Sequence, residues 1–293
     1  EIVFTDGQPA EAFALEQQPD YGTMALALLA DSDDVFADAD LPFRALPIPL
    51  FESHEGRPAA TRDFGQKLIG SIGARKRLGP GEQAEFAFIL AWHFDGLWWD
   101  SLPFIQDVRS LRRFYGTRFR DAADVVRYVA REFERLSLQT RLWHDTWYDS
   151  TLPYWLLDRT LATISTLATA TCYRFSNGRF YGWEGTYCCG GTCTHVWQYA
   201  QAVGRLFPAL ERSTREMIDF GLAFDDTTGI IHYRAEAHRE LAVDGQAGTI
   251  LRLYAFYEPL RTFSYIAVPF LPIPRMQCAL PRPSNHGPPT FGR

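Results

Sequence analysis

The sequence lacks several features that would place it in a familiar class of protein at once. Its 293 residues contain no apolar run of the roughly 20 residues that a membrane span needs. The 35 acidic and 29 basic residues are well mixed and leave a net charge of −6, which does not indicate a nucleic-acid partner. No glycine-rich nucleotide loop and no Ser-His-Asp signature is present. We therefore expect no membrane span, no nucleic acid and no cofactor.

Cysteine is also scarce, with five residues, three of which are Cys188, Cys189 and Cys193. There is no CxxC pair, and a zinc site would need a fourth ligand such as His195 or His232. An odd count with three cysteines close together does not fit a secreted disulfide framework. We predict structural thiols, no metal site, and a reducing, cytoplasmic compartment.

The first 95 or so residues have the pattern of β-structure. Residues 85–92 form an apolar run of strand length after the turn signal Pro80-Gly81. Residues 24–29 are a second candidate strand, although their composition would also suit a helix. Gly, Pro and Asp interrupt such segments about every ten residues, as in a β-sandwich. The chain begins with strand-like residues rather than a signal peptide, so we expect the N-terminal part of this sandwich to be missing.

The apolar period changes to that of helices near residue 120. Asp121 is a good N-cap, and apolar residues follow it at i, i+3 and i+4 spacing. Further helices are predicted from Pro153, over residues 194–207, after Pro208, and from about Gln246. Helices that follow a β-domain and are joined by long loops predict a sandwich that leads into a helical toroid.

The composition shifts again at the C-terminus. Residues 259–293 contain no Asp or Glu and hold eight of the eighteen prolines. Such a segment cannot continue a helix bundle, and we expect the helical pattern to stop near Tyr254. Two interpretations stay open, a disordered tail and a slipped reading frame. The predicted organisation is a sandwich portion over 1–110, a partial toroid over 111–256 and a tail over 257–293.

Residues 178–197 carry the clearest chemical signal. Glu184 stands between Trp183 and a glycine, small residues follow, and the pattern then turns helical. In sugar-processing enzymes, aromatic faces stack on the pyranose and a carboxylate stabilises positive charge at the anomeric carbon. Glu184 is therefore the candidate catalytic residue, and Trp183 and Tyr181 are candidate sugar neighbours. A surface glutamate and aromatic residues that only pack are the alternatives.

Three more polar residues are candidate substrate contacts. His195 begins a predicted helix eleven residues after Glu184 and is placed to bond a sugar hydroxyl or the carboxylate. His232 follows a turn at residues 225–229 and is a second candidate. Asp244 precedes the last predicted helix and is either a second carboxylate or a helix cap. A core histidine is the alternative for His195.

Several short motifs together resemble glycoside hydrolase family 116, which includes the non-lysosomal glucosylceramidase and prokaryotic β-glucosidases and β-xylosidases. They are residues 147–150 (WYDS), 178–185 (GRFYGWEG), 194–200 (THVWQYA), 206–211 (LFPALE) and 244–246 (DGQ). The match is closest to the prokaryotic branch. The resemblance covers about residues 20–254 and is most specific in its second half.

The resemblance implies the end of an N-terminal β-sandwich followed by the first part of an (α/α)6 toroid, and retaining hydrolysis of a β-glycoside or glycolipid. It implies Glu184 as the nucleophile and a sugar contact from His232. At His195 the chain departs from the glucosylceramidase branch, where an Asp stands. The family's acid/base Asp lies far beyond its nucleophile, and this chain offers no counterpart for it after Tyr254. We therefore expect an incomplete glycosidase with little or no activity by itself.

Two other functions stay open. A non-catalytic carbohydrate-binding or interaction protein would use the same aromatic residues without chemistry. An inverting glycosidase would hold its two carboxyl groups about 6.5–9.5 Å apart, whereas a retaining enzyme needs about 5–5.5 Å.

Overall fold

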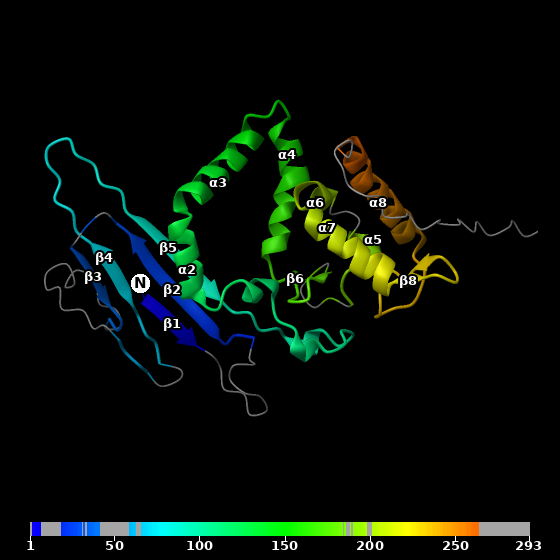
Figure 1. Ribbon diagram of the computed structural model, residues 1–293, viewed down its shortest axis with the longest axis horizontal. Helices are drawn as coiled ribbons and strands as arrows, with labels where there is room; N and C mark the ends of the chain where they lie inside the picture. Colours follow the sequence, from blue (N-terminus) through cyan, green and yellow to red (C-terminus); the bar gives the residue numbers. More distant parts are fainter. Residues whose placement is uncertain are drawn as a thin grey trace, which may run out of the picture. The chain divides into compact units, whose positions relative to one another are not determined.

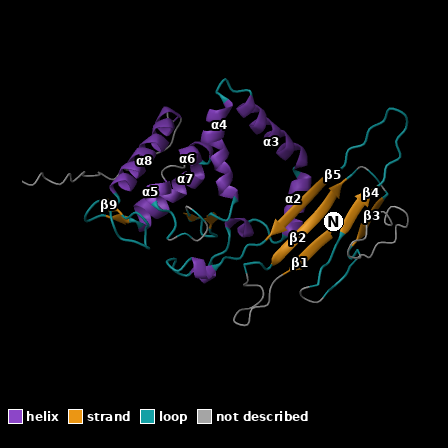
Figure 2. Ribbon diagram, turned by 180° about the vertical axis from the view of Figure 1, so that it is seen from behind, coloured by secondary structure: helices purple, strands orange, loops and turns teal. Residues whose placement is uncertain are grey.

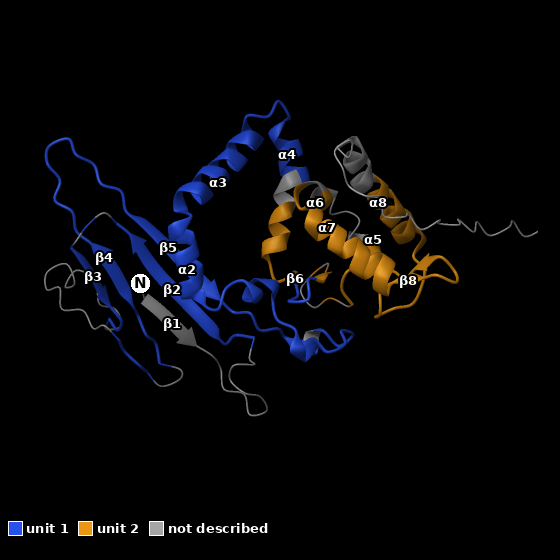
Figure 3. Cartoon of the chain, in the orientation of Figure 1, with its two compact units in different colours: residues 1–163, 173–178 blue, residues 164–172, 179–293 orange. Residues whose placement is uncertain are grey.

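A computed structural model describes residues 2–6, 19–30, 32, 34–41, 59–62, 66–183, 185, 188, 190–197 and 201–263 (Figure 1). The chain divides into two compact units, coloured separately in Figure 3. Unit 1 comprises residues 1–163 and 173–178, and unit 2 comprises residues 164–172 and 179–293. The division falls well after the predicted boundary near residue 110, because helices that follow this point belong to unit 1.

Unit 1 contains an antiparallel sheet of the strands β1 (Ile2–Asp6), β2 (Gly22–Leu29) and β5 (Ala87–His93). Figure 2 shows β2 between the other two strands. A second, two-stranded antiparallel sheet is formed by β3 (Val35–Asp38) and β4 (Ser71–Ala74). The strands predicted at 24–29 and 85–92 are thus confirmed as β2 and β5. Along both strands, large apolar side chains on one face alternate with mostly small side chains on the other.

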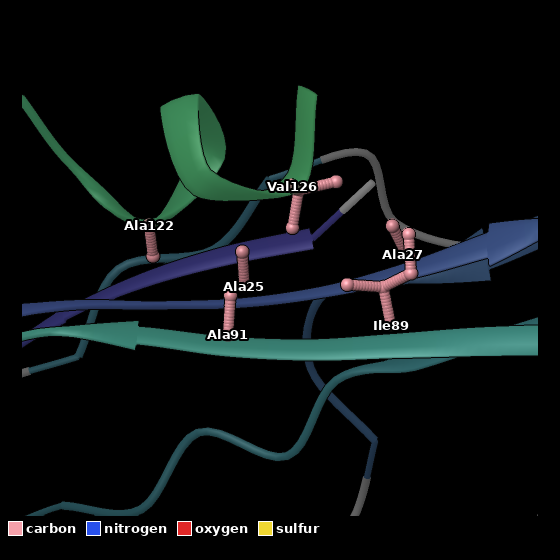
Figure 4. Packing of buried hydrophobic residues seen from close by; sticks show 6 residues of the cluster. All are labelled: Ala25, Ala27, Ile89, Ala91, Ala122 and Val126. Atoms are coloured by element: carbon pink, nitrogen blue, oxygen red, sulfur yellow. The ribbon is translucent and has the colours of Figure 1, made fainter. Parts of the chain in front are cut away.

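The two faces of the three-stranded sheet differ in their surroundings. On one face, small side chains of β2 and β5 pack against the helix α2 (Ala122–Arg131) and form the core of unit 1. Figure 4 shows Ala122 and Val126 of α2 directed toward Ala25, Ala27, Ile89 and Ala91. On the other face of β5, Phe88, Leu90 and Trp92 are 57%, 59% and 61% exposed. The period of two along β5 therefore separates a packed face from an open one.

The start of α2 is fixed by two hydrogen bonds. The Asp121 carboxylate accepts the backbone N–H of Asp124 at 2.7 Å, so the predicted N-cap is confirmed. The Ala122 N–H donates to Thr23 Oγ1 of β2 at 2.8 Å. These bonds and the apolar contacts of Val126 attach α2 to the sheet, which is why α2 belongs to unit 1.

Two further helices of unit 1 have little cover. Helix α3 (Phe133–Tyr148) has no buried residue, and α4 (Tyr154–Leu161) begins after the predicted Pro153. Trp143 and Trp147 of α3 contact edge to face, with ring centroids 5.3 Å apart. The described residues also form four short 3-10 helices, the last of which spans the division between the units. They are η2 (Trp99–Ser101), η3 (Val108–Ser110), η4 (Phe114–Thr117) and η5 (Ala162–Ala168). Across the described ranges, no helix is both long and apolar enough to cross a bilayer.

Unit 2 is built from short strands and mostly short helices. Strand β6 (Cys172–Arg174) lies where the division between the units falls. The elements that follow are β7 (Phe180–Gly182), α5 (Thr194–Trp197), α6 (Gln201–Leu206), α7 (Pro208–Thr214), the π-helix η6 (Arg215–Leu222), β8 (Phe224–Asp225), β9 (Ile230–Ile231) and α8 (Val243–Phe263). Apolar packing comes from Ile218, Ala223, Ile231 and Ala235.

One helix prediction in unit 2 needs correction, and another is described only in part. Of the helix predicted over 194–207, residues 194–197 and 201–206 are helical, and residues 198–200 lie outside the described residues. Helix α8 begins at Val243, earlier than predicted, and continues past Tyr254 to Phe263. Good helix formers such as Ala255 and Leu260 follow Tyr254, and they continue the helix even though Pro259 lacks a backbone donor.

The described residues form a mixed structure of helices and small antiparallel sheets, without a closed barrel. The sandwich and the (α/α)6 toroid therefore stay predictions, as do the domain limits at 110 and 256. The tail predicted over 257–293 is helical as far as Phe263, and its remainder lies outside the described residues.

Candidate functional site

The segment that carries the family-like motif begins in a buried strand. Tyr181 of β7 is 2% exposed and Trp183 is 8% exposed, and their rings contact edge to face at 5.0 Å. The Tyr181 hydroxyl accepts the backbone N–H of Gly191 at 2.8 Å. Both aromatic residues therefore pack inside unit 2 in this structure, and neither presents an open ring face to solvent.

The loop that follows β7 is closed by two hydrogen bonds at its base. The Thr192 N–H donates to the Gly182 carbonyl at 2.6 Å, and the Gly182 N–H donates to Thr192 Oγ1 at 3.3 Å. Thr192 has a positive φ of 55°, which β-branched residues rarely adopt. A backbone held in this conformation requires firm support from its surroundings, and strained positions of this kind cluster at functional sites.

Glu184, the predicted nucleophile, lies outside the described residues. The chain on both sides of it is described: Trp183 precedes it and Gly185 follows it. Its neighbours in sequence therefore belong to a segment whose two ends, Gly182 and Thr192, are hydrogen-bonded to each other.

His195 and Asp244 lie together at the starts of two helices. His195 Nδ1 is 3.4 Å from Asp244 Oδ2, and the side chains are 46% and 55% exposed. The junction is tight, because a β-carbon on Gly245 would stand 2.4 Å from Thr194 Oγ1. Only glycine at this position lets α8 approach α5 so closely. A histidine and a carboxylate predicted from separate motifs thus form one pair that solvent reaches.

His232 occupies a different environment. Its backbone N–H donates to the Ala223 carbonyl at 2.8 Å, and it forms an isolated β-bridge with Leu241. Its Nδ1 atom is buried and has no hydrogen-bond partner among the described residues. An imidazole nitrogen can bond a hydroxyl, but this nitrogen is closed to solvent and a ligand would reach it only after the turn opens.

Gln246 of α8 ties the turn before His232 to the helix. Its Nε2 donates to the Gly229 carbonyl at 3.1 Å, and its Oε1 accepts the Ile231 N–H at 3.2 Å. Gly229 has a φ of 74°, so the turn needs a residue without a β-carbon. The turn at 225–229 is thereby held against the first turns of α8.

Aromatic rings border the pair of His195 and Asp244. The Tyr233 ring lies 5.5 Å from the His195 ring, edge on, and stacks on His238 at 5.8 Å. The Thr194 N–H donates to the Tyr233 carbonyl at 2.8 Å, which fixes this residue to the start of α5.

A buried group of four charges lies deeper in unit 2. Glu211 of α7, Arg215 and Asp219 of η6 and Arg252 of α8 are each at most 4% exposed. Arg252 donates through Nε to Glu211 Oε1 at 3.0 Å and through Nη2 to Glu211 Oε2. Arg215 pairs with Asp219, and its Nε lies 3.4 Å from Glu211. The cluster has only a weak signal in the sequence, where Glu211, Arg215 and Asp219 recur at a spacing of four residues with alternating charge.

Burial changes the protonation chemistry of this cluster. Loss of solvation raises the pKa of Asp219 to about 6, while Arg215 and Arg252 oppose the rise and Glu211 adds to it. Burial also lowers the pKa of Arg252, against the attraction of Glu211. At the exposed turn, the backbone N–H of Thr227 lowers the pKa of Asp225.

Metal-binding residues do not cluster in the part of the chain that is described. No group of three or more His, Cys, Asp and Glu side chains lies close enough there to hold an ion. Cys172 and Cys193 are buried thiols and Cys188 is an exposed one. Cys189 lies outside the described residues.

The described candidate residues all lie in unit 2, but their environments differ. His195 and Asp244 form an accessible pair, His232 lies in the adjoining turn region, and Tyr181 and Trp183 are buried. No protein-family model matches the sequence, and no curated protein matches it.

Proposed function

We propose that unit 2 carries the nucleophile of a retaining β-glycosidase and that Glu184 is this residue. The observation that supports the proposal is the way the family-like segments meet within unit 2. The segment at 178–185 is bonded to Thr192, the start of α5 to Tyr233, and His195 to Asp244. Segments up to some sixty residues apart in sequence are therefore connected near Gly182 and Thr192, the two residues between which Glu184 lies in the sequence.

In the proposed reaction, a Glu184 carboxylate oxygen attacks the anomeric carbon of a β-glycoside. The bond from this carbon to the leaving oxygen breaks, and a glycosyl ester on Glu184 forms. The departing oxygen of a natural substrate needs a proton from a second carboxyl group about 5–5.5 Å from the nucleophile. Absence of such an acid lowers the rate by roughly 10²–10⁴-fold, so we expect weak turnover of ordinary glycosides by this chain.

The paired residues have a separate part in the proposal. His195 and Asp244 are about half exposed and lie at adjoining helix starts, where they are placed to bind sugar hydroxyls. His232 lies in the neighbouring turn, and its buried Nδ1 would contact a sugar only if this turn opens on binding. We assign Tyr181 and Trp183 to packing beneath the loop, because both rings are almost fully buried.

A substrate whose leaving group needs no acid tests the nucleophile directly. The full chain is incubated with 2,4-dinitrophenyl 2-deoxy-2-fluoro-β-glucoside, which releases dinitrophenolate without a proton and leaves a slowly hydrolysed ester. We expect release of one equivalent of dinitrophenolate and a matching mass increase on the peptide that contains Glu184. The Glu184→Gln variant should show neither.

Glu216→Gln is the matched control, because Glu216 is an exposed glutamate of η6 in the same unit. It should react as the parent chain does. Folding of each variant is checked by circular dichroism. A label on another carboxylate, or a folded chain that takes up no label, would contradict the proposal. A different outcome would favour the non-catalytic binding protein. In that case the parent chain takes up no label, and it binds glucose or cellobiose as well as the Glu184→Gln variant does.

A further inference from the structure

Four ionisable side chains hold the helices of unit 2 together without contact with solvent. Glu211 comes from α7, Arg215 and Asp219 from η6, and Arg252 from α8. Their exposed fractions are 1%, 2%, 1% and 4%. Helix α6 also borders the group, because a β-carbon on Gly204 would stand 3.4 Å from Glu211 Cγ. A proton gained or lost here therefore changes the charge within the packing of several helices.

The two carboxylates of the cluster are not equivalent. Glu211 accepts from Arg252 at two oxygens and also lies 3.4 Å from Arg215 Nε, so both guanidinium groups compensate its charge. Among the described residues, Asp219 has a hydrogen bond from Arg215 alone. Arg215, Arg252 and Glu211 are the charged groups that act on Asp219 from η6, α8 and α7. Asp219 is thus the carboxylate whose negative charge is less well compensated.

We propose that this cluster is a proton-sensitive clamp between α7, η6 and α8, in which Asp219 takes up a proton under mildly acidic conditions while Glu211 stays ionised between the two arginines. The cluster carries no net charge with Asp219 ionised and one positive charge with it protonated. Glu211, which contacts both arginines, keeps them together in either state. The clamp depends on unit 2 alone and does not require glycosidase activity.

Burial raises the pKa of Asp219 from 3.8 to about 6. A carboxyl whose folded pKa lies above its unfolded value binds its proton more tightly in the folded chain. Its contribution therefore favours folding at low pH, and this advantage is lost as the pH rises from about 4 through about 6. This sign is opposite to that of the exposed Asp225, whose pKa is lowered.

Equilibrium urea denaturation across pH 4.5–7.5 measures this contribution by difference. The ratio of the unfolding constants of the parent chain and Asp219→Asn should rise by about 30-fold over this range, since the variant has no proton to exchange at this site. Asp225→Asn is the control, and its corresponding ratio should stay nearly constant, because a carboxyl whose pKa is lowered is largely ionised in both the folded and the unfolded chain over this range. Equal pH slopes for the parent chain and Asp219→Asn would overturn the proposal.

Infrared spectroscopy of the parent chain provides a readout that does not depend on folding of Asp219→Asn. A carbonyl stretch of a buried, protonated carboxylic acid should grow as the pH falls through about 6. The conservative Asp219→Glu variant should shift this band and so assign it. A parent chain in which no buried carboxyl protonates between pH 7.5 and 4.5 would also overturn the proposal.

Discussion

Gly191 lies against the ring of Tyr181 so closely that a β-carbon at this position would stand 2.3 Å from Tyr181 Cε1. The Gly191 N–H also donates to the hydroxyl of the same tyrosine at 2.8 Å. The glycine thus contacts both the face and the polar end of a side chain that is 2% exposed. The contact lies directly before Thr192, the residue that is hydrogen-bonded to Gly182.

Gly191→Ala should destabilise unit 2 by about 1–3 kcal/mol, because the methyl group displaces a buried ring that has no room to move. Gly185→Ala is the control in the same loop, since a β-carbon there meets nothing within 4 Å. Urea denaturation followed by circular dichroism compares the two. Equal stability of both variants would show that Tyr181 can move aside.

Arg252→Met should remove about 3 kcal/mol of stability. The substitution leaves the buried Glu211 carboxylate with only Arg215 at 3.4 Å, and a buried charge that loses its partner is strongly unfavourable. Arg239→Met, at an exposed position of the same unit, serves as the control and should change stability by less than about 0.5 kcal/mol. A small effect at Arg252 would mean that the cluster gains water or rearranges.

Asp121→Ala should lower the stability of unit 1 by about 1 kcal/mol, because it removes the acceptor for the Asp124 N–H at the start of α2. Replacement of the exposed Asp158 in α4 by Ala removes a carboxylate without a capping role and should have little effect. Asp121→Asn should retain most of the stability. Failure of Asn to rescue would argue against the capping bond.

Asp244→Asn should separate a binding role from a structural one. An ion pair between half-exposed side chains contributes at most about 1 kcal/mol, so the melting behaviour should hardly change. If His195 and Asp244 hold a sugar, the rate at which the fluoroglucoside labels Glu184 should fall on the order of tenfold. Glu240→Gln, at a nearby exposed position, should label normally. Unchanged labelling of Asp244→Asn would remove the pair from the proposed site.

The sequence allowed accurate prediction of elements whose signals are local. The apolar run of strand length at β5 and the cap at Asp121 depend on neighbouring residues, and both the strand and the cap were predicted correctly. Helix limits were predicted less well, since α8 continues past Tyr254 despite the proline that follows. The proline-rich composition after residue 258 predicted that the helix would end near Tyr254. Good helix formers after Tyr254 continue the helix to Phe263.

The candidate site shows the same limit. A motif predicted His195 and Asp244 separately, but their pairing depends on Gly245, which lets α8 approach Thr194. The sequence pattern does not indicate how close α8 lies to Thr194. Similarly, the four-residue spacing of Glu211, Arg215 and Asp219 is visible in the sequence, but it is equally typical of a solvated helix face. Their burial follows from packing against other helices, which include α6 at Gly204 and α8 at Arg252.

The open face of β5 has a practical consequence for experiments on this chain. Phe88, Leu90 and Trp92 present apolar surface on a strand that pairs only with β2 in the described sheet. Association through such surface strengthens on warming, so turbidity should increase with protein concentration during a thermal scan. Midpoints from heating would then depend on scan rate and concentration rather than on stability alone. Dilute samples in urea keep the chains apart, and they allow the energies of both units to be measured reversibly.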